Sequence, residues 1–122
     1  MSKAELIREP DAEREKHNWG TMIWYCGGER GRSEEMTFAQ CELLPDCKTR
    51  EHHHEECEEI IHVVNGIVRH HMAGERDFLE LSDGDTLVIP PCKKHQIENI
   101  GDEQASIIMI WSSANLEIVE EE

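Results

Sequence analysis

Short apolar segments, separated by turn residues, follow one another along most of the chain. Each segment has the length of a β-strand, and several are rich in the β-branched residues that strands favour. They are Thr21–Cys26, Met36–Leu44, Glu59–Val64, Ile67–Ala73, Phe78–Leu81, Thr86–Ile89, His95–Ile100 and Ala105–Ser112. No convincing helical periodicity occurs after residue 20. The pattern therefore predicts an all-β fold.

The residues between these segments indicate tight turns. Asn65-Gly66 stands between two apolar runs, which is typical of a β-hairpin because a type I′ turn needs positive φ at both positions. Ser82–Asp85 breaks the chain before Thr86–Ile89, and Pro90-Pro91 ends that strand. Many short strands at close spacing predict a sandwich or a barrel.

A length of 122 residues suits one compact domain. We predict a polar lead-in over residues 1–20, with a short helix within residues 2–17, and one β-barrel domain over residues 21–116. Residues 117–122 are expected to form a frayed acidic tail.

The charge and the cysteine count limit the classes of function. A formal net charge of −15 argues against binding to nucleic acid, which needs clustered Lys and Arg. The longest apolar runs, Ile60–Val64 and Ile107–Trp111, are far shorter than the roughly 20 residues that span a bilayer. The N-terminal residues lack the apolar segment of a secretory signal. Five cysteines, an odd number without paired spacing, favour a reducing compartment. We therefore expect a cytoplasmic protein.

Histidine and glutamate concentrate between Cys47 and Gly66. On a strand, His52 and His54 would point to the same face, about 7 Å apart, and His53 to the opposite face. Either Glu58 or Glu59 could add a carboxylate: simple alternation favours Glu58, whereas Glu59 needs a bend or bulge before it. Taken alone, this stretch is also typical of a solvated charged face, or of a zinc site that uses Cys57.

A downstream segment supplies a partner for this stretch, and together they resemble the two motifs of the cupin superfamily. The first motif is matched by Asp46 in place of a glycine, then His52, His54, Glu59 and Gly66. The second is matched by Gly84, Pro90, Cys92 in place of a glycine, His95 and Asn99. The resemblance covers roughly residues 40–112, and its spacing selects Glu59 over Glu58.

The resemblance implies a jelly-roll β-barrel, also called a double-stranded β-helix, that holds a divalent metal. The implied metal ligands are His52, His54, Glu59 and His95. Such a set leaves one or two coordination positions open for water or substrate, as catalytic sites do. Imidazole and carboxylate together suit Fe²⁺, Mn²⁺, Ni²⁺ or Zn²⁺, and the sequence does not choose among them.

Three further residues are candidates for proton transfer. His70 and His71 are adjacent on a predicted strand, so one of them should face the barrel interior, as a hydrogen-bond partner of a ligand or as a general base. The alternative is a histidine without a catalytic role. Tyr25, the only tyrosine, could reach the site from an N-terminal strand, as a tyrosine does in some cupin lyases.

The resemblance implies a metal-dependent enzyme for a small molecule, and we favour a non-haem dioxygenase, an oxidoreductase, acting on a small carboxylate or enol-type substrate. The alternatives are a lyase, isomerase or cyclase, and a non-catalytic ligand-binding or sensing module. A homodimer is also expected, because Ile60–Val64 is apolar on both faces and its outer face needs a cover.

Overall fold

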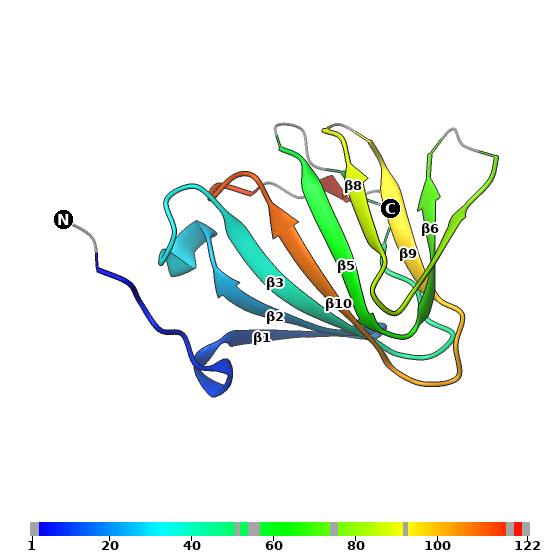
Figure 1. Cartoon of the computed structure of the whole chain (residues 1–122), viewed down its shortest axis with the longest axis horizontal. Coiled ribbons are helices and arrows are strands. Elements are labelled where there is room, and N and C mark those ends of the chain that lie inside the picture. Colours follow the sequence, from blue (N-terminus) through cyan, green and yellow to red (C-terminus); the bar gives the residue numbers. More distant parts are fainter. Residues whose placement is uncertain are drawn as a thin grey trace.

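The computed structural model describes residues 3–50, 52–53, 57–73, 76–91, 93–116 and 119–120. Two antiparallel sheets face each other, one with the strand order β1-β2-β3-β10-β5-β8 and the other with the order β11-β4-β9-β6-β7 (Figure 1). The first sheet contains β1 Glu13–His17, β2 Gly20–Cys26, β3 Thr37–Leu43, β5 Glu59–Asn65, β8 Thr86–Ile89 and β10 Ala105–Trp111. The second contains β4 His52–His53, β6 Ile67–Met72, β7 Leu79–Ser82, β9 His95–Asn99 and β11 Val119–Glu120.

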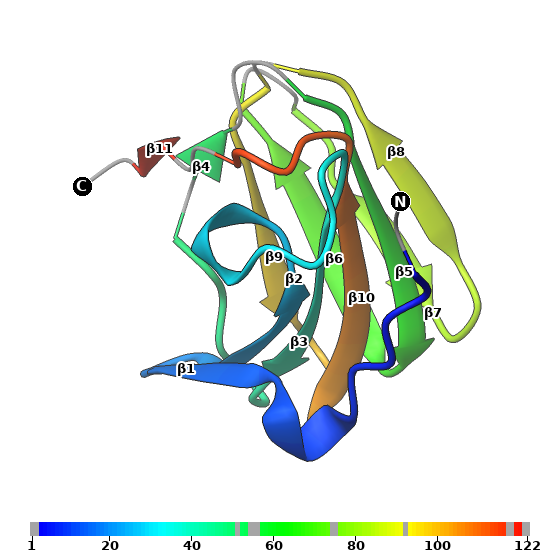
Figure 2. The same cartoon turned by 90° about the vertical axis from the view of Figure 1, so that its left-hand side faces the viewer.

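This architecture confirms the predicted all-β jelly-roll barrel. Figure 2, turned by 90°, shows the two sheets facing each other from another side. Every strand expected from the sequence is present, with ends that differ by one residue at most. Alternation explains this agreement: along β3, inward residues are buried and outward ones are half-buried.

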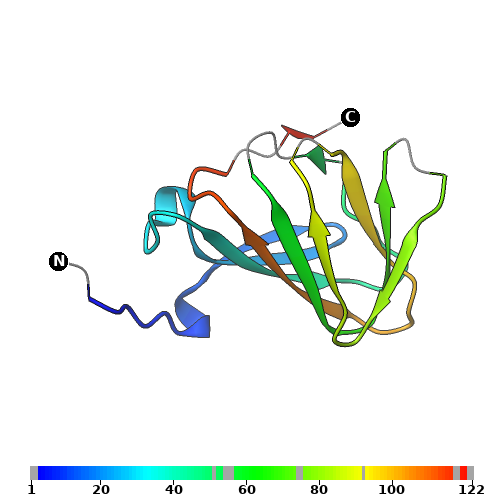
Figure 3. The same cartoon turned by 45° about the horizontal axis from the view of Figure 1, so that its top comes forward.

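The N-terminal segment differs from the prediction. A three-residue 3₁₀ helix, Glu9–Asp11, precedes β1, and β1 pairs along its whole length with β2. All residues of β1 are exposed, so it lacks the alternation that marks a half-buried strand. At the other end, β11 pairs with β4 at one end of the barrel (Figure 3). Part of the expected acidic tail is therefore a strand.

The hydrophobic core fills the space between the sheets. Its members come from both inner faces and are almost completely shielded from water. The largest of them include Trp111, Leu43, Ile61, Ile97 and Ile107. Burial of each such side chain contributes about 1.5–3 kcal/mol, so this core supplies the main stabilisation of the barrel.

Two turns depend on the left-handed backbone conformation. The turn at Asn65-Gly66 connects β5 to β6, but these strands belong to different sheets and do not pair, so the predicted β-hairpin is wrong. Gly66 has φ of +117°, and a Cβ there would lie 2.6 Å from the Cβ of Ala105. Asp46, which stands where the cupin motif has glycine, has φ of +59°. Aspartate tolerates this conformation better than most residues, so the turn keeps a glycine-like geometry.

No helix in the described part of the chain is long and apolar enough to cross a membrane.

Candidate metal centre

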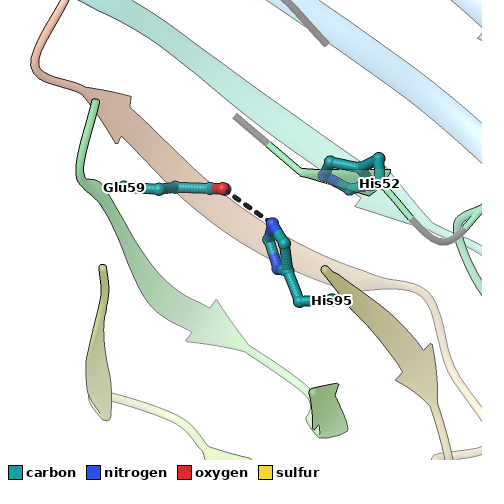
Figure 4. Close-up of side chains that lie close together, drawn as sticks. All are labelled: His52, Glu59 and His95. Atoms are coloured by element: carbon teal, nitrogen blue, oxygen red, sulfur yellow. Dashed lines mark ion pairs between the residues drawn. The ribbon is translucent and has the colours of Figure 1, made fainter. Parts of the chain in front are cut away.

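His52, Glu59 and His95 come together from both sheets (Figure 4). His52 and His95 each begin a strand, β4 and β9, and are direct cross-strand partners. Glu59 begins β5 in the facing sheet. One potential ligand atom from each residue lies within 4.8 Å of the others. The site is therefore built where three strands start at the same end of the barrel.

The side chains of the cluster are held in place by short contacts. The Nε2 of His95 lies 3.1 Å from a carboxylate oxygen of Glu59, and both residues are only 1% exposed. The rings of His52 and His95 lie 4.4 Å apart, centroid to centroid. The Nδ1 of His52 lies 2.8 Å from the backbone carbonyl oxygen of Arg50. If Nδ1 donates its hydrogen to that oxygen, the Nε2 of His52 is left as an electron-pair donor.

These groups fit a divalent transition metal. Imidazole nitrogens and a carboxylate oxygen bind such ions at about 2.0–2.2 Å, so two ligands of one ion lie at most about 4.4 Å apart. A contraction of a few tenths of an ångström would bring all three atoms onto one ion. A buried carboxylate is also costly unless positive charge or hydrogen bonds compensate it, which a cation between Glu59 and His95 would do.

The other residues considered for the site fall into two groups. His54 lies outside the described residues, as does Cys92, so His54 stays a prediction as the fourth ligand. Glu58 is exposed, whereas Glu59 is buried in the cluster, so the carboxylate that meets the histidines is Glu59. Cys57 packs into the hydrophobic core.

His70 lies directly behind His95. Its Nε2 is 2.9 Å from the Nδ1 of His95, and the residue is 1% exposed. Burial, followed by the neighbouring His95, lowers the pKa of His70 to about 4. A neutral His70 can accept a hydrogen bond from His95 Nδ1, which leaves the Nε2 of His95 available to a metal. Of the two adjacent histidines, His70 therefore faces the interior.

His71 and Tyr25 are not brought to this cluster. The Nε2 of His71 lies 3.1 Å from a carboxylate oxygen of Glu98, and its side chain is 39% exposed. Tyr25 sits at a register shift of β2, where its ring packs edge-on against Phe38 at 5.5 Å. It lines an outer groove with Phe38 and Met36, and its neighbour Trp24 is the buried one. Because neighbouring residues of a strand point to opposite faces, the inward position of Trp24 leaves Tyr25 on the outer face, away from the site.

A cavity borders the cluster at His52. Its volume is about 90 Å³, and its lining consists of Glu15, His17, Trp19, Met22, Trp24, Thr49, Arg50, His52, Met109 and Trp111. The sequence pattern did not reveal the contribution of β1 and the loop after it to this lining. Met22 and Trp24 are two residues apart, as are Met109 and Trp111, so each pair points to the same face of its strand. This pattern could have indicated the apolar wall of the cavity.

The fold and the site together define a jelly-roll barrel with a histidine and glutamate group in its interior. The cupin domain model matches residues 39–111, and the chain belongs to the cupin family. It is 36% identical over 89 residues to an uncharacterized protein of Methanocaldococcus jannaschii, an alignment that covers 70% of each chain.

Solved structures with the same fold include oxalate decarboxylases. The enzyme of Lactobacillus farciminis, in a formate complex, superposes with a TM-score of 0.83 at 20% identity, over 91% of this chain and 34% of its own. The enzyme of Bacillus subtilis, which has Mn(II) centres, gives the same TM-score and identity over 93% of this chain and 31% of its own. The chain thus spans about a third of the length of these proteins, and at this identity the likeness shows the fold alone.

Proposed function

We propose that this protein is a metal-dependent enzyme that acts on a small carboxylate or enol-type substrate. The observation that carries the proposal is the convergence of His52, Glu59 and His95 beside a cavity that can admit a small molecule. Fe²⁺, Mn²⁺, Ni²⁺ and Zn²⁺ all suit this donor set. His54 is the proposed fourth ligand. A metal bound there supplies Lewis-acid chemistry or, with iron, redox chemistry.

The residues of the chain have separate roles in this proposal. His52 and His95 offer Nε2 lone pairs, and Glu59 offers a carboxylate from the facing sheet. His70 accepts the hydrogen bond of His95 and fixes its tautomer, so it is a positioning residue and not a general base. Because Trp111 is the cross-strand partner of Glu59, the apolar wall stands next to the ligands and limits the access of water.

Within this class we favour a non-haem dioxygenase, and a lyase, isomerase or cyclase is the alternative. The structural neighbours are oxalate decarboxylases, which makes small carboxylates the first compounds to test. A cytoplasmic location also stays a prediction. The free thiols of Cys26, Cys41, Cys47 and Cys57 suit a reducing compartment.

A screen of small carboxylates and enediols, with and without O₂, tests the proposal. Protein loaded in turn with Fe²⁺, Mn²⁺, Ni²⁺ or Zn²⁺ is compared with Glu59→Gln, which keeps the shape of the side chain but removes its charge. We expect metal-dependent turnover in the wild type, with O₂ consumed if the reaction is a dioxygenation. Turnover without O₂ would support the lyase or isomerase alternative. Tight binding without product would support a sensing role, and equal turnover by Glu59→Gln would overturn the proposal.

We also propose that the chain forms a homodimer through the outer face of the first sheet. Val88, Ile60, Ile110 and Phe38 are successive cross-strand partners on β8, β5, β10 and β3. Val88 is 57% exposed and Ile60 is 38% exposed. Such a row of apolar side chains across several strands is typical of a surface that is covered by a partner.

A further inference from the structure

The wall of the cavity beside His52 is mainly aromatic and thioether. All three tryptophans of the chain, Trp19, Trp24 and Trp111, contribute to it. Trp24 and Trp111 stack on each other at a centroid distance of 5.6 Å. Met22 and Met109 complete the apolar part, and both are at least nine-tenths buried. Tryptophan faces and methionine sulfur are favourable partners for flat, polarizable groups.

The polar lining lies toward β1 and the segment before β4. His17, whose Nε2 is 2.8 Å from a carboxylate oxygen of Glu15, stacks on Trp19 with ring centroids 4.5 Å apart. Thr49 and Arg50 complete this side. The cavity therefore has an apolar wall and a polar side, an arrangement that orients a ligand.

The apolar wall is continuous with the proposed metal ligands. His52 belongs both to the ligand cluster and to the cavity lining. Trp111, on the wall, is the cross-strand partner of Glu59, and Met109 lies two residues before it on the same face of β10. A molecule whose oxygen atoms bind the metal would thus have its remaining atoms against tryptophan and methionine.

The wall also contains a buried polar atom. The indole nitrogen of Trp24 has no hydrogen-bond partner among the described residues, although Trp24 is only 5% exposed. One face of this ring is covered by the guanidinium of Arg30 at 4.6 Å. A buried N–H group without an acceptor is costly. An acceptor oxygen of a ligand that reached this nitrogen would reduce the cost.

We propose that the substrate carries a flat apolar group of about the size of one aromatic ring, joined to an oxygen-bearing head that binds the metal. The tryptophan and methionine side chains of the wall favour an apolar group over a second carboxylate, which would have to reach Arg50 on the polar side. An apolar ring would be desolvated by the same wall. This inference rests on the proposed function, because the metal fixes the head of the substrate.

Two hydroxamates that differ only in the apolar group test the inference. Acetohydroxamate and benzohydroxamate present the same pair of oxygen atoms, and the second has a phenyl ring in place of the methyl group. Their dissociation constants are measured by calorimetry on the full chain loaded with Mn²⁺ or with Zn²⁺, after the metal content has been determined. We expect benzohydroxamate to bind at least about tenfold more tightly, the order of discrimination that an apolar pocket gives for a group of this kind.

Matched variants connect this preference to the cavity. Met22→Gln replaces a thioether of the wall by an amide of similar length and should reduce the preference at least about threefold, since the ring then contacts a polar group. Met36→Gln makes the same change at an exposed position outside the cavity and should leave the preference unchanged. Trp19→Leu is a second test of the wall, because Trp19 is only half-buried and its replacement by another apolar residue should disturb the core less than a change at Met22.

The outcomes separate this inference from the proposed function. Metal-loaded protein that binds both hydroxamates equally would overturn the inference and leave the metal site intact. An equal preference in wild type, Met22→Gln and Trp19→Leu would overturn it as well. Absence of metal binding would overturn the proposed function and the inference together.

Discussion

The Nε2 of His70 lies 2.9 Å from the Nδ1 of His95 in the barrel interior. The other nitrogen of His95 is directed at Glu59, so this imidazole links a buried histidine to the carboxylate of the ligand cluster. The hydrogen bond between His95 and His70 limits the rotation of this ring and leaves the Nε2 lone pair of His95 on the side of Glu59. The orientation of His95 is therefore fixed before a metal binds, which lowers the cost of binding.

Replacement of His70 should weaken metal binding without removing a ligand. His70→Phe keeps an aromatic ring but loses the acceptor for His95, and we expect the metal affinity to fall about 10–100-fold. His70→Gln retains an acceptor oxygen and should restore part of the affinity. His71→Phe is the matched control, because His71 contacts Glu98 and not His95. Competition with a chromophoric chelator measures the metal affinity of all three variants. Equal affinities for His70→Phe and His71→Phe would contradict this role.

Removal of metal should lower the thermal stability of the wild type. A ligand at 100 times its dissociation constant stabilises the folded state by about 2.7 kcal/mol, which corresponds to roughly 10 °C in Tm for a domain of this size. Thermal unfolding is followed by circular dichroism after chelation and again after metal is restored. Glu59→Gln should show little change between the two conditions. If metal does not change the Tm of the wild type, the folded protein does not bind metal at this site.

Gly66→Ala should destabilise the barrel strongly. A Cβ at this position would lie 2.9 Å from the Cα of Ala105, and φ is +117°, so both contact and backbone strain oppose the change. We expect a loss of about 2–4 kcal/mol in the free energy of unfolding. Gly84→Ala shares the positive φ but meets open space, so it should lose only about 1 kcal/mol. Urea unfolding distinguishes the two, and equal losses would show that the contact with Ala105 is unimportant.

A charged residue in the row Val88, Ile60, Ile110 and Phe38 should convert the proposed dimer to a monomer. Ile60→Lys places an ammonium group in the middle of the outer face of the first sheet, where a second copy would desolvate it. Ile67→Lys makes the same change on β6 of the other sheet, at a residue of similar exposure, and should leave the dimer intact. Light scattering coupled to size-exclusion chromatography gives both masses. A wild-type monomer, or a dimer that survives Ile60→Lys, would contradict the proposed interface.

Residue alternation explains why most of the fold could be predicted from the sequence. Along β10 the inward residues Ala105, Ile107, Met109 and Trp111 are buried, and those between them are half-buried. The strand β1 could not be predicted in this way, because Glu13–His17 is polar on both faces and becomes a strand by pairing with β2. That pairing is a tertiary contact, which local pattern does not report.

The candidate site was predictable only in part for a related reason. Motif spacing identified His52, Glu59 and His95, and these do converge. His52 and Glu59 belong to strands of different sheets, so alternation along one continuous strand does not relate them. For this reason alternation alone favoured the wrong carboxylate, Glu58. The positions of His70, His71 and Tyr25 depend on which residues of β6 and β2 face the interior, and the local sequence does not give this. The polar side of the cavity includes residues of β1, which was not predicted as a strand.

Metal content is the most direct test of the central claim, that His52, Glu59 and His95 bind one ion. Plasma mass spectrometry of protein loaded with each divalent metal and then desalted should give about one ion per chain for the wild type. His52→Ala, Glu59→Gln and His95→Ala should each retain less than about a tenth of this. His62→Ala should retain the same metal content as the wild type, because the His62 side chain forms a hydrogen bond with Thr86 and is not part of the ligand cluster. Full occupancy in the three ligand variants would contradict the account.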